Sequence, residues 1–546
     1  NKIGVAPLKE GLEIILSAKT HDDIAAIFAE YQKIGVNIPI NLDVAFDKKD
    51  SKKFDIFVMQ SGVALDKDKY TSKDKRAIKE LKYYRQYITD ILTLAKVDNV
   101  SNIVNDYIKV ESKLAEIQLD VVGLKNLIKV YKIADFKKLN SILSNINLER
   151  YLKVNGIKQS ETFTIEQEDY LKAFNEAFIK IDVEVWKSYL IAKYIGKYGA
   201  STITEFNNKS FEHNKNLGLV KKRQSLEDRT LSITNQNLGM LLAKLYIKYN
   251  FNPKSKIKAK ELIDNIIAQY RITISKSTLF SEKTKEKALI KLDKMVFHIG
   301  YPDKWQDYSS LKIDKHDYIG NNKRVTAYNM SDALNMLGKP LEDTKWLAHP
   351  PQVVNASYNS STNQFVILAG ILNKPFFDLN ASDAYNYGAI GMVIAHEIGH
   401  GFDDSGSRYD QDGNLVDWWQ EEDRVKYNKR AKDLISQADN FEYMPGKHLN
   451  GKLEIGEIIG DLNGVTLALA AYEKIIKEKG LDRKASLKEF FIQLSKVWRN
   501  KYEPQVLVNM VHTNTHPVSE FRVNGILKNI DTFHEIFETK KGDGMY

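Results

Sequence analysis

The sequence predicts a mainly α-helical (α+β) protein of at least two domains, with a small β-sheet in one of them. Its 546 residues exceed the roughly 250 to 300 residues that a single hydrophobic core serves. Most of the chain repeats apolar residues at spacings of three and four, which is the period of an amphipathic helix. Two short runs, residues 352–358 and 364–369, have the alternation and β-branched composition of strands instead.

The first 215 residues are predicted to form a mainly helical domain that is poor in catalytic groups. Helical periodicity is clear in three segments, residues 78–92, 107–119 and 168–179. Residues 214–225 contain a glycine and a run of three basic residues, and we predict a linker there. The predicted domains are therefore 1–215 and 216–546, with a segment near 280–330 that can return to the first domain.

Composition narrows the possible functions. The chain has no cysteine, which excludes a disulfide framework, a thiolate metal site and a cysteine nucleophile. Its net charge of +9 comes from 80 basic and 71 acidic residues that are interspersed, a pattern typical of solvated surface rather than of a nucleic-acid-binding stripe. No apolar run approaches the roughly 18 residues of a membrane span. We expect a monomer without nucleic-acid partners, and the start at Asn1 rather than Met indicates an upstream segment that was removed or left out.

The second domain is predicted to begin with helices and then to form a β-hairpin. The helical segments are residues 226–249, 257–279 and 280–295, followed by a break at 299–302. The two strand-like runs come next, and the polar residues 359–363 between them predict a turn. Such a hairpin could bind an extended peptide as an added strand, although an ordinary edge hairpin has the same sequence pattern.

The pattern H-E-x-x-H begins at His396. Because His396 and His400 are four residues apart, a helix places both imidazoles on one face, where they can bind Zn²⁺ with Glu397 beside them as general base. The preceding residues are mostly apolar and follow Ser382 or Asp383 as a candidate N-cap, which predicts a buried helix. A helix with two histidines that bind no metal fits the pattern too, so a third ligand is needed.

A second apolar helix, at residues 454–472, offers that ligand. Glu457 and Asp461 are four residues apart on one face, where a carboxylate pair is costly unless it is paired or metal-bound. We assign Glu457 to the metal and Asp461 to the far nitrogen of a ligand histidine, where it would fix the tautomer. Glu454 is the competing ligand, but it lies near the helix start, where a capping role suffices.

With these residues in place, the chain resembles the neprilysin and endothelin-converting-enzyme family of zinc metallopeptidases, and more narrowly its bacterial oligopeptidase O branch. The motifs that carry the resemblance are Asn355-Ala356-x-Tyr358, Ala369-Gly370-Ile371-Leu372 with Pro375-Phe376-Phe377, residues 396–404, Asp412-Gly413 with residues 415–419, Gly456-Glu457-x-x-x-Asp461, and His516-Pro517-x-x-x-Arg522-Val523-Asn524-Gly525. The likeness covers most of the second half. It is fainter in the first half, at residues 60–70, and at 299–302.

The resemblance implies a fold and an activity. The implied fold is a thermolysin-like zinc peptidase domain with a small β-sheet, plus a large helical cap domain that encloses a cavity. The implied activity is that of a metalloendopeptidase with one Zn²⁺ per chain, which hydrolyses oligopeptides on the amino side of bulky hydrophobic residues. Disulfide-rich relatives are eukaryotic, so the lack of cysteine favours a bacterial-type member. For such a member, a basic pI and a removed leader favour an extracytoplasmic location, periplasmic or secreted, over a cytoplasmic one.

The resemblance also implies roles for individual residues. His396, His400 and Glu457 match the metal ligands, Glu397 matches the base, and Asp461 matches an aspartate often described as a proton donor. The matches on the substrate side are Asn355 and Ala356 for the strand that holds the peptide backbone, His516 for the oxyanion and Arg522 for a substrate carbonyl. Six residues match the pocket for the side chain after the cut: Ile371, Phe376, Met392, Val393, Val497 and Trp498. Ordinary core packing explains these six equally well.

Some features depart from the family pattern. Asn514 stands two residues before His516 where an aspartate is common, so the orientation of His516 is an open point. Leu462-Asn463 replaces a polar and a glycine position, and the family's opening segment has no counterpart before Asn1.

Two other classes of function remain as alternatives to a peptidase. A peptide-binding protein without turnover would not need Glu397, and a basic nucleic-acid-binding protein would need clustered charge.

Overall fold

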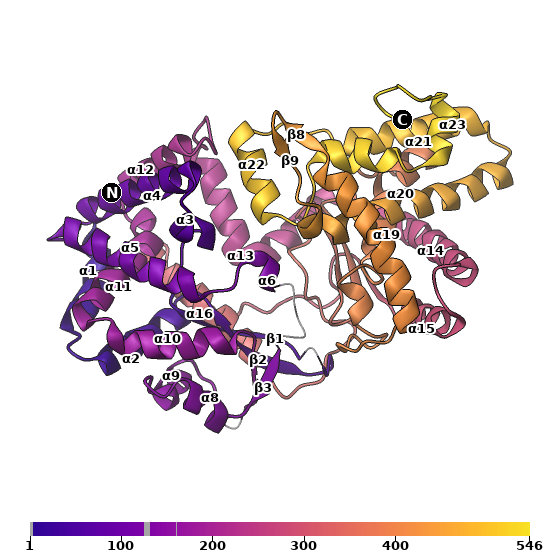
Figure 1. Ribbon diagram of the computed structural model, residues 1–546. Helices are drawn as coiled ribbons and strands as arrows, with labels where there is room; N and C mark the ends of the chain where they lie inside the picture. The colour runs from indigo at the N-terminus through magenta and orange to yellow at the C-terminus, as the bar shows by residue number, and fades with distance from the viewer. Residues whose placement is uncertain (1–3, 48, 125–130, 160) are drawn as a thin grey trace. The chain divides into compact units, whose positions relative to one another are not determined.

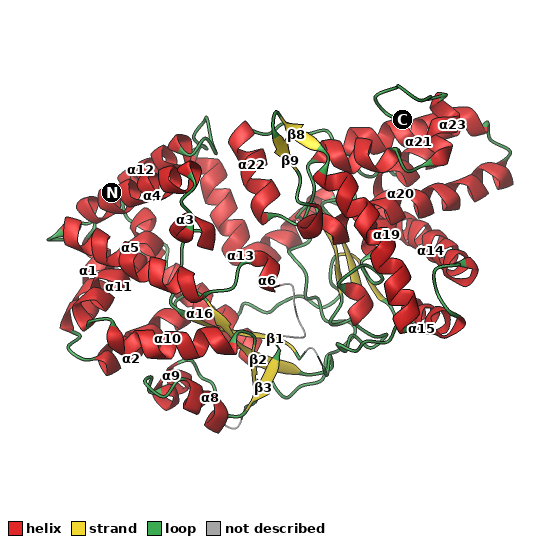
Figure 2. Ribbon diagram, in the orientation of Figure 1, coloured by secondary structure: helices red, strands yellow, loops and turns green. Residues whose placement is uncertain are grey.

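The structure is a computed structural model that describes residues 4–47, 49–124, 131–159 and 161–546, most of them helical (Figure 2). The chain divides into two compact units (Figure 1). Unit 1 comprises Asn1–Asp47, Lys53–Ile233 and Asp307–Pro340, and unit 2 comprises Lys48–Lys52, Thr234–Gln306 and Leu341–Tyr546. The chain leaves unit 1 inside helix α13 (Leu226–Asn250) and not at the predicted linker, and the returning segment is 307–340. The role of unit 1 as a cap stays a prediction.

Unit 1 consists mainly of amphipathic helices around an apolar core. Its longer helices are α1 (Lys9–Ser17), α2 (His21–Lys33), α4 (Lys75–Leu94), α5 (Val100–Ile117), α10 (Glu168–Lys180), α11 (Val183–Tyr198), α12 (Thr204–Asn216) and α16 (Tyr318–Leu334). Its shorter ones are α3 (Lys67–Thr71), α6 (Val121–Leu124), α8 (Phe136–Ile142) and α9 (Leu148–Val154). The three segments with clear helical periodicity lie in α4, α5 and α10, so those predictions are confirmed.

Unit 1 also contains a four-stranded sheet that was not predicted from the sequence. Its strands are β1 (Ile40–Phe46), β2 (Phe54–Gln60), β3 (Lys132–Ala134) and β4 (Phe163–Ile165), in the order β1-β2-β4-β3. β1 and β2 pair antiparallel, and β4 then pairs parallel with β2 and antiparallel with β3. β3 and β4 are too short for a period of two to show in the sequence, and their pairing joins segments far apart in the chain.

Unit 2 contains the remaining helices. They are the rest of α13, then α14 (Pro253–Lys276), α15 (Glu282–Asp293), α17 (Asp383–Asn386), α18 (Met392–Gly399), α19 (Glu421–Asp439), α20 (Gly451–Lys479), α21 (Arg483–Val497), α22 (Pro504–Thr513) and α23 (Asp531–Phe537). The three helices predicted after the linker correspond to α13, α14 and α15 and are confirmed. Short 3₁₀ or π turns (η1 to η5) and the small ribbon β8 (Glu442–Met444) and β9 (Lys447–His448) complete the elements.

The sheet of unit 2 has three strands in the order β5-β7-β6. β6 (Ala356–Asn359) and β7 (Gln364–Leu368) pair antiparallel, which confirms the predicted hairpin. β5 (Val296–Gly300) pairs parallel with β7, so the residues interpreted as a break include the end of a strand. β6 has a strand neighbour on one side only within the described sheet, which leaves its other edge free for a further strand.

Helices α18 and α20 pack with their backbones in close approach. A Cβ atom at Gly464 would lie 2.8 Å from the carbonyl oxygen of Met392, and one at Gly460 would lie 2.8 Å from Cε1 of the His396 ring. Both positions therefore exclude any side chain, and they lie one helical turn apart on the face of α20 that meets α18. The close contact brings the next residues along that face, Glu457 and Asp461, up to the histidines of α18.

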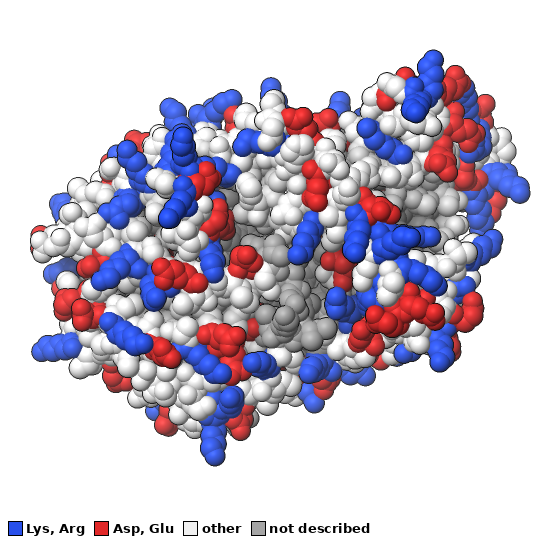
Figure 3. Space-filling model, viewed as in Figure 1, with Lys and Arg blue, Asp and Glu red and all other residues white. Residues whose placement is uncertain are grey.

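The surface carries mixed charge. Figure 3 shows lysine and arginine side chains intermingled with aspartate and glutamate side chains over the face in view. Among the described helices, none is both long enough and apolar enough to cross a membrane.

Candidate active site

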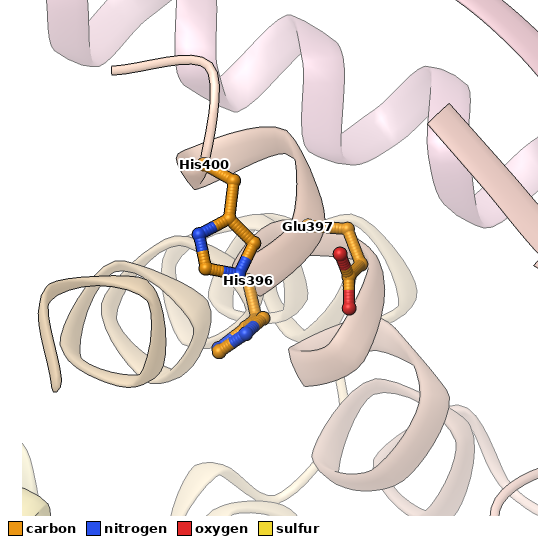
Figure 4. Close-up of side chains that lie close together, drawn as sticks. All are labelled: His396, Glu397 and His400. Atoms are coloured by element: carbon orange, nitrogen blue, oxygen red, sulfur yellow. The ribbon is translucent and has the colours of Figure 1, made fainter. Parts of the chain in front are cut away.

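The H-E-x-x-H sequence begins on α18, a helix whose residues are all buried, and ends at His400, the C-cap residue of that helix. Its approach begins at α17, where the Ser382 hydroxyl accepts a hydrogen bond from the Tyr385 backbone N–H, so Ser382 is the N-cap of that helix. A π-helical turn, η3 (Tyr387–Gly391), connects α17 to α18. Figure 4 shows the His396 and His400 imidazoles together on one side of α18 with the Glu397 carboxylate next to them. The ligand atoms of these three residues lie within 4.8 Å of one another.

Glu457, from α20, faces both histidines. Its Oε2 atom lies 3.2 Å from Nε2 of His396 and 3.8 Å from Nε2 of His400. Burial alone would raise the pKa of Glu457, but the neighbouring imidazoles of His396 and His400 hold it well below its usual range. Glu457 is therefore ionised. Glu454, the competing candidate, is fully buried near the start of α20 and does not line the cavity described below.

The other nitrogen of His396 faces Asp461. Nδ1 of His396 lies 2.9 Å from Oδ1 of Asp461, a carboxylate with no exposed surface. Arg522 donates two hydrogen bonds to the same carboxylate, from Nε at 2.7 Å and Nη2 at 2.6 Å. Burial would raise the pKa of Asp461, and the Arg522 cation overrides this and lowers it. Arg522, matched by resemblance to a substrate contact, is thus also the counter-ion of Asp461, and its guanidinium stacks 3.9 Å from the Trp498 ring centroid.

Asp403, which has no role predicted from the sequence, plays the same part for His400. Its Oδ2 lies 2.7 Å from Nδ1 of His400. Burial would lower the pKa of His400, but the hydrogen bond and charge of Asp403 raise it to about 10. Asp403 lies three residues after His400 in the turn that follows α18, so its nearness in sequence was the signal available.

Glu397 is 9% exposed and lies between the two histidines in sequence. Burial raises the pKa of Glu397, against the opposing effect of the His396 and His400 imidazoles. A raised pKa moves a carboxylate toward the value that suits a general base near neutral pH.

Asn514 orients His516. Its Oδ1 accepts a hydrogen bond from the backbone N–H of His516 at 2.9 Å and lies 2.9 Å from Nδ1 of the ring. Because an amide oxygen only accepts, Nδ1 is the donor, and the ring turns Nε2 toward Glu457 Oε2, 3.3 Å away. An asparagine thus supplies the acceptor at the position where an aspartate was expected.

The histidines, Glu397, Glu457, Arg522 and Trp498 line a cavity of about 390 Å³, which is within the range of ligand sites. The predicted site residues that line it are Asn355, Ala356, Ile371, Phe376, Met392, Val393, His396, Glu397, His400, Glu457, Trp498, His516 and Arg522. Val497 is buried beside Trp498 but is not among the described lining residues, and Asp461 lies behind His396. Ser357 and Tyr358, which had no assigned role, also line the cavity because they continue β6.

The donor set fits a zinc ion. Bond lengths of about 2.0 to 2.2 Å in a tetrahedral zinc site place neighbouring ligand atoms about 3.3 Å apart, and Glu457 Oε2 and His396 Nε2 are 3.2 Å apart. Glu457 Oε2 is buried and accepts no hydrogen bond of ordinary geometry within the described chain. Each histidine has its other nitrogen next to a carboxylate, as ligand histidines usually do.

A helical H-E-x-x-H pair, a glutamate from a second helix and an edge strand beside them define a metallopeptidase of the zinc-dependent class. Comparison with known proteins then identifies the family within this class. Two models described as peptidase family M13 match residues 1–302 and 355–546. The chain therefore belongs to peptidase family M13, the neprilysin and endothelin-converting-enzyme family, and is a zinc metalloendopeptidase.

Individual relatives agree with this assignment. The zinc metalloprotease Zmp1 of Mycobacterium tuberculosis, solved with an inhibitor, shares 32% identity and a TM-score of 0.94 over 100% of this chain and 84% of its own. Neprilysin-3 of Drosophila melanogaster is 28% identical over 94% of this chain and 69% of its own length. A neutral endopeptidase of Lactococcus lactis is 27% identical over 93% and 80%.

Proposed function

We propose that this zinc endopeptidase holds one zinc ion on His396, His400 and Glu457 and cleaves oligopeptides before bulky hydrophobic residues. The observation that carries the metal assignment is the position of Glu457 Oε2, a buried, ionised oxygen 3.2 and 3.8 Å from the Nε2 atoms of two histidines. Asp461 and Asp403 then hold the two imidazoles from behind.

Glu397 is the proposed general base. Zinc, when bound, polarises the scissile carbonyl and makes the attacking water more acidic. The Glu397 carboxylate takes a proton from that water and returns it to the leaving amine, a task that its raised pKa suits. His516 lies on the cavity wall, where its imidazole can stabilise the negative charge that develops on the carbonyl oxygen.

The free edge of β6 is the proposed binding site for the peptide backbone. Its residues from Asn355 to Tyr358 line the cavity, so a substrate added as a strand would pass the metal ligands. The side chain of Asn355 is exposed and makes no hydrogen bond within the described chain, which leaves its amide available to substrate. Arg522 lies on the same cavity and keeps Asp461 ionised.

An apolar part of the cavity supports the proposed cleavage preference. Ile371, Phe376, Met392, Val393 and Trp498 supply its apolar wall. Burying a Phe or Leu side chain there would contribute roughly 1.5 to 3 kcal/mol relative to leaving it in water. Val497, behind this wall, would support Trp498 without touching substrate.

A matched peptide panel tests the proposal. Peptides identical except for the residue after the scissile bond, with Phe, Leu, Ala or Asp there, should differ in kcat/KM, and Phe and Leu should exceed Ala by about tenfold or more. Mass spectrometry of the products gives the site of cleavage.

The metal assignment is tested separately. Glu457→Ala should abolish zinc binding in a chelator competition, whereas Glu454→Ala, its neighbour one turn earlier on α20, should not. Zinc retained by Glu457→Ala, or lost with Glu454→Ala, would reassign the third ligand. Equal rates across the peptide panel would remove the proposed hydrophobic preference but not the metal site.

A further inference from the structure

Lys291, on α15, is a lysine with no exposed surface. Its Nζ atom donates hydrogen bonds to two backbone carbonyls, those of Gly406 at 2.8 Å and Tyr409 at 2.7 Å. Its ammonium also faces the rings of three aromatic residues at 5.8 to 6.0 Å, Tyr358, Phe402 and Trp418. No carboxylate in the described chain lies within ion-pair distance of it. A buried ammonium is costly unless its charge is compensated. The hydrogen bonds to the backbone carbonyls of the 406–409 loop supply that compensation.

That loop comes shortly after the metal-binding helix, which ends at Gly399. The Gly406 backbone N–H donates to Oδ1 of Asp403 at 2.6 Å, and the Ser405 N–H donates to the same oxygen at 2.9 Å. The other carboxylate oxygen, Oδ2, lies 2.7 Å from Nδ1 of His400. Gly406 therefore connects two partners, because its carbonyl binds Lys291 and its N–H binds Asp403.

The loop has no room for a side chain at Gly406. A Cβ atom there would lie 1.7 Å from the carbonyl oxygen of His400, so the Gly406 backbone rests directly on the end of α18. The side chain of Lys291 reaches this point from a different helix. Gly406, which binds Lys291 through its carbonyl and Asp403 through its N–H, is therefore the link through which a change at Lys291 can reach Asp403.

We propose that Lys291 is a positioning residue for the metal site: it fixes Gly406, which fixes the Asp403 carboxylate, which orients the His400 imidazole. The inference rests on the proposed role of His400 as a zinc ligand. A positioning role differs from a general role in core stability, because it requires that changing Lys291 alters metal binding and that changing another buried lysine does not.

Lys193 supplies the matched control. It lies in unit 1, is 7% exposed, and pairs with the fully buried Glu111 at 2.6 Å. The variants Lys291→Met and Lys193→Met each replace a buried ammonium with an apolar side chain of similar length. Zinc affinity is measured for both by chelator competition, and ligand geometry by the visible absorption of the cobalt(II)-substituted proteins.

Lys291→Met is expected to weaken zinc binding by about 10- to 100-fold and to change the cobalt spectrum. Losses of this size are typical when a residue that supports the metal ligands is removed. Lys193→Met should leave both unchanged. Unchanged zinc affinity and spectrum in a folded Lys291→Met protein would overturn the inference. If Lys291→Met does not fold, Lys291→Gln takes its place with the same expected result. If the wild-type protein binds no zinc, the proposed metal site itself fails.

A double-mutant cycle distinguishes the route through Asp403 from any other. In the Asp403→Asn background, Lys291→Met should lower zinc affinity further by less than threefold, because the carboxylate that Lys291 positions is already absent. Independent losses that multiply would show that Lys291 acts on the metal site by another path, and the proposal would be wrong.

Discussion

Asp461→Asn should destabilise the fold and weaken the metal site together. The Asp461 carboxylate has no exposed surface and accepts hydrogen bonds from Arg522 at 2.7 and 2.6 Å. Removing its charge leaves the Arg522 guanidinium, itself 7% exposed, without its hydrogen-bonded counter-ion, and only Glu457, whose Oε2 lies 4.0 Å from Nη2, is left within ion-pair distance. Breaking a buried pair in this way costs about 3 to 5 kcal/mol of the free energy of unfolding.

The effect on the metal arises from a second contact of the same carboxylate. Oδ1 of Asp461 lies 2.9 Å from Nδ1 of His396, and losing such a partner lowers metal affinity about 10- to 100-fold. Arg522→Met is the matched control, because it breaks the same ion pair but keeps a carboxylate next to His396. At pH 8 it should destabilise the fold to a similar extent and retain more of the zinc affinity than Asp461→Asn does.

Denaturant unfolding of the metal-free proteins measures the first effect, and chelator competition measures the second. The double variant should be more stable than the sum of the two single losses implies, by about 0.5 to 3 kcal/mol, because neither charge is then left alone. Strictly additive losses would refute the stabilising pair between Asp461 and Arg522. Equal zinc affinities in the two single variants would refute the action of Asp461 on His396.

Three further predictions concern the chemistry. Glu397→Gln should lower kcat by several orders of magnitude while zinc stays stoichiometric, because an amide cannot accept the proton, and near-normal cleavage would remove Glu397 from the mechanism. His516→Ala should lower kcat on the order of a hundredfold with unchanged zinc content, and zinc loss would make His516 a ligand. The metal-free protein should lose stability as pH rises from about 6.5, the pKa of an unfolded histidine, to about 10, the raised pKa of folded His400, because deprotonation ends its ion pair with Asp403. Zinc affinity should rise over the same range because zinc replaces that proton, and a flat profile would contradict the pairing.

The parts of the site that the sequence predicted lie within single elements. His396 and His400 share a face of α18, and Glu457 shares a face of α20 with Asp461, so the helical period alone relates them. The hairpin that contains β6 was predictable for the same reason, since its two strands are joined by a short turn.

The parts that it could not predict depend on contacts between distant segments. Arg522 pairs with Asp461 across 61 residues, and no local pattern indicates that partner. The pairing of β5 with β7, and of β4 with β2, likewise joins segments far apart in the chain. Lys291 reads as one of many lysines on a charged helix, and only the fold shows that its side chain is buried.

The two glycines of α20 that face α18 have a consequence for protein engineering. Gly464 lies against the Met392 carbonyl and Gly460 lies against the His396 imidazole, so the spacing of the ligands depends on these two close contacts and not on the apolar residues around them. The cavity wall uses other side chains, among them Phe376 and Val393. A library randomised at those two wall positions should therefore yield altered peptide preferences on an unchanged metal centre, whereas a single added methyl group at Gly460 should abolish every activity at once.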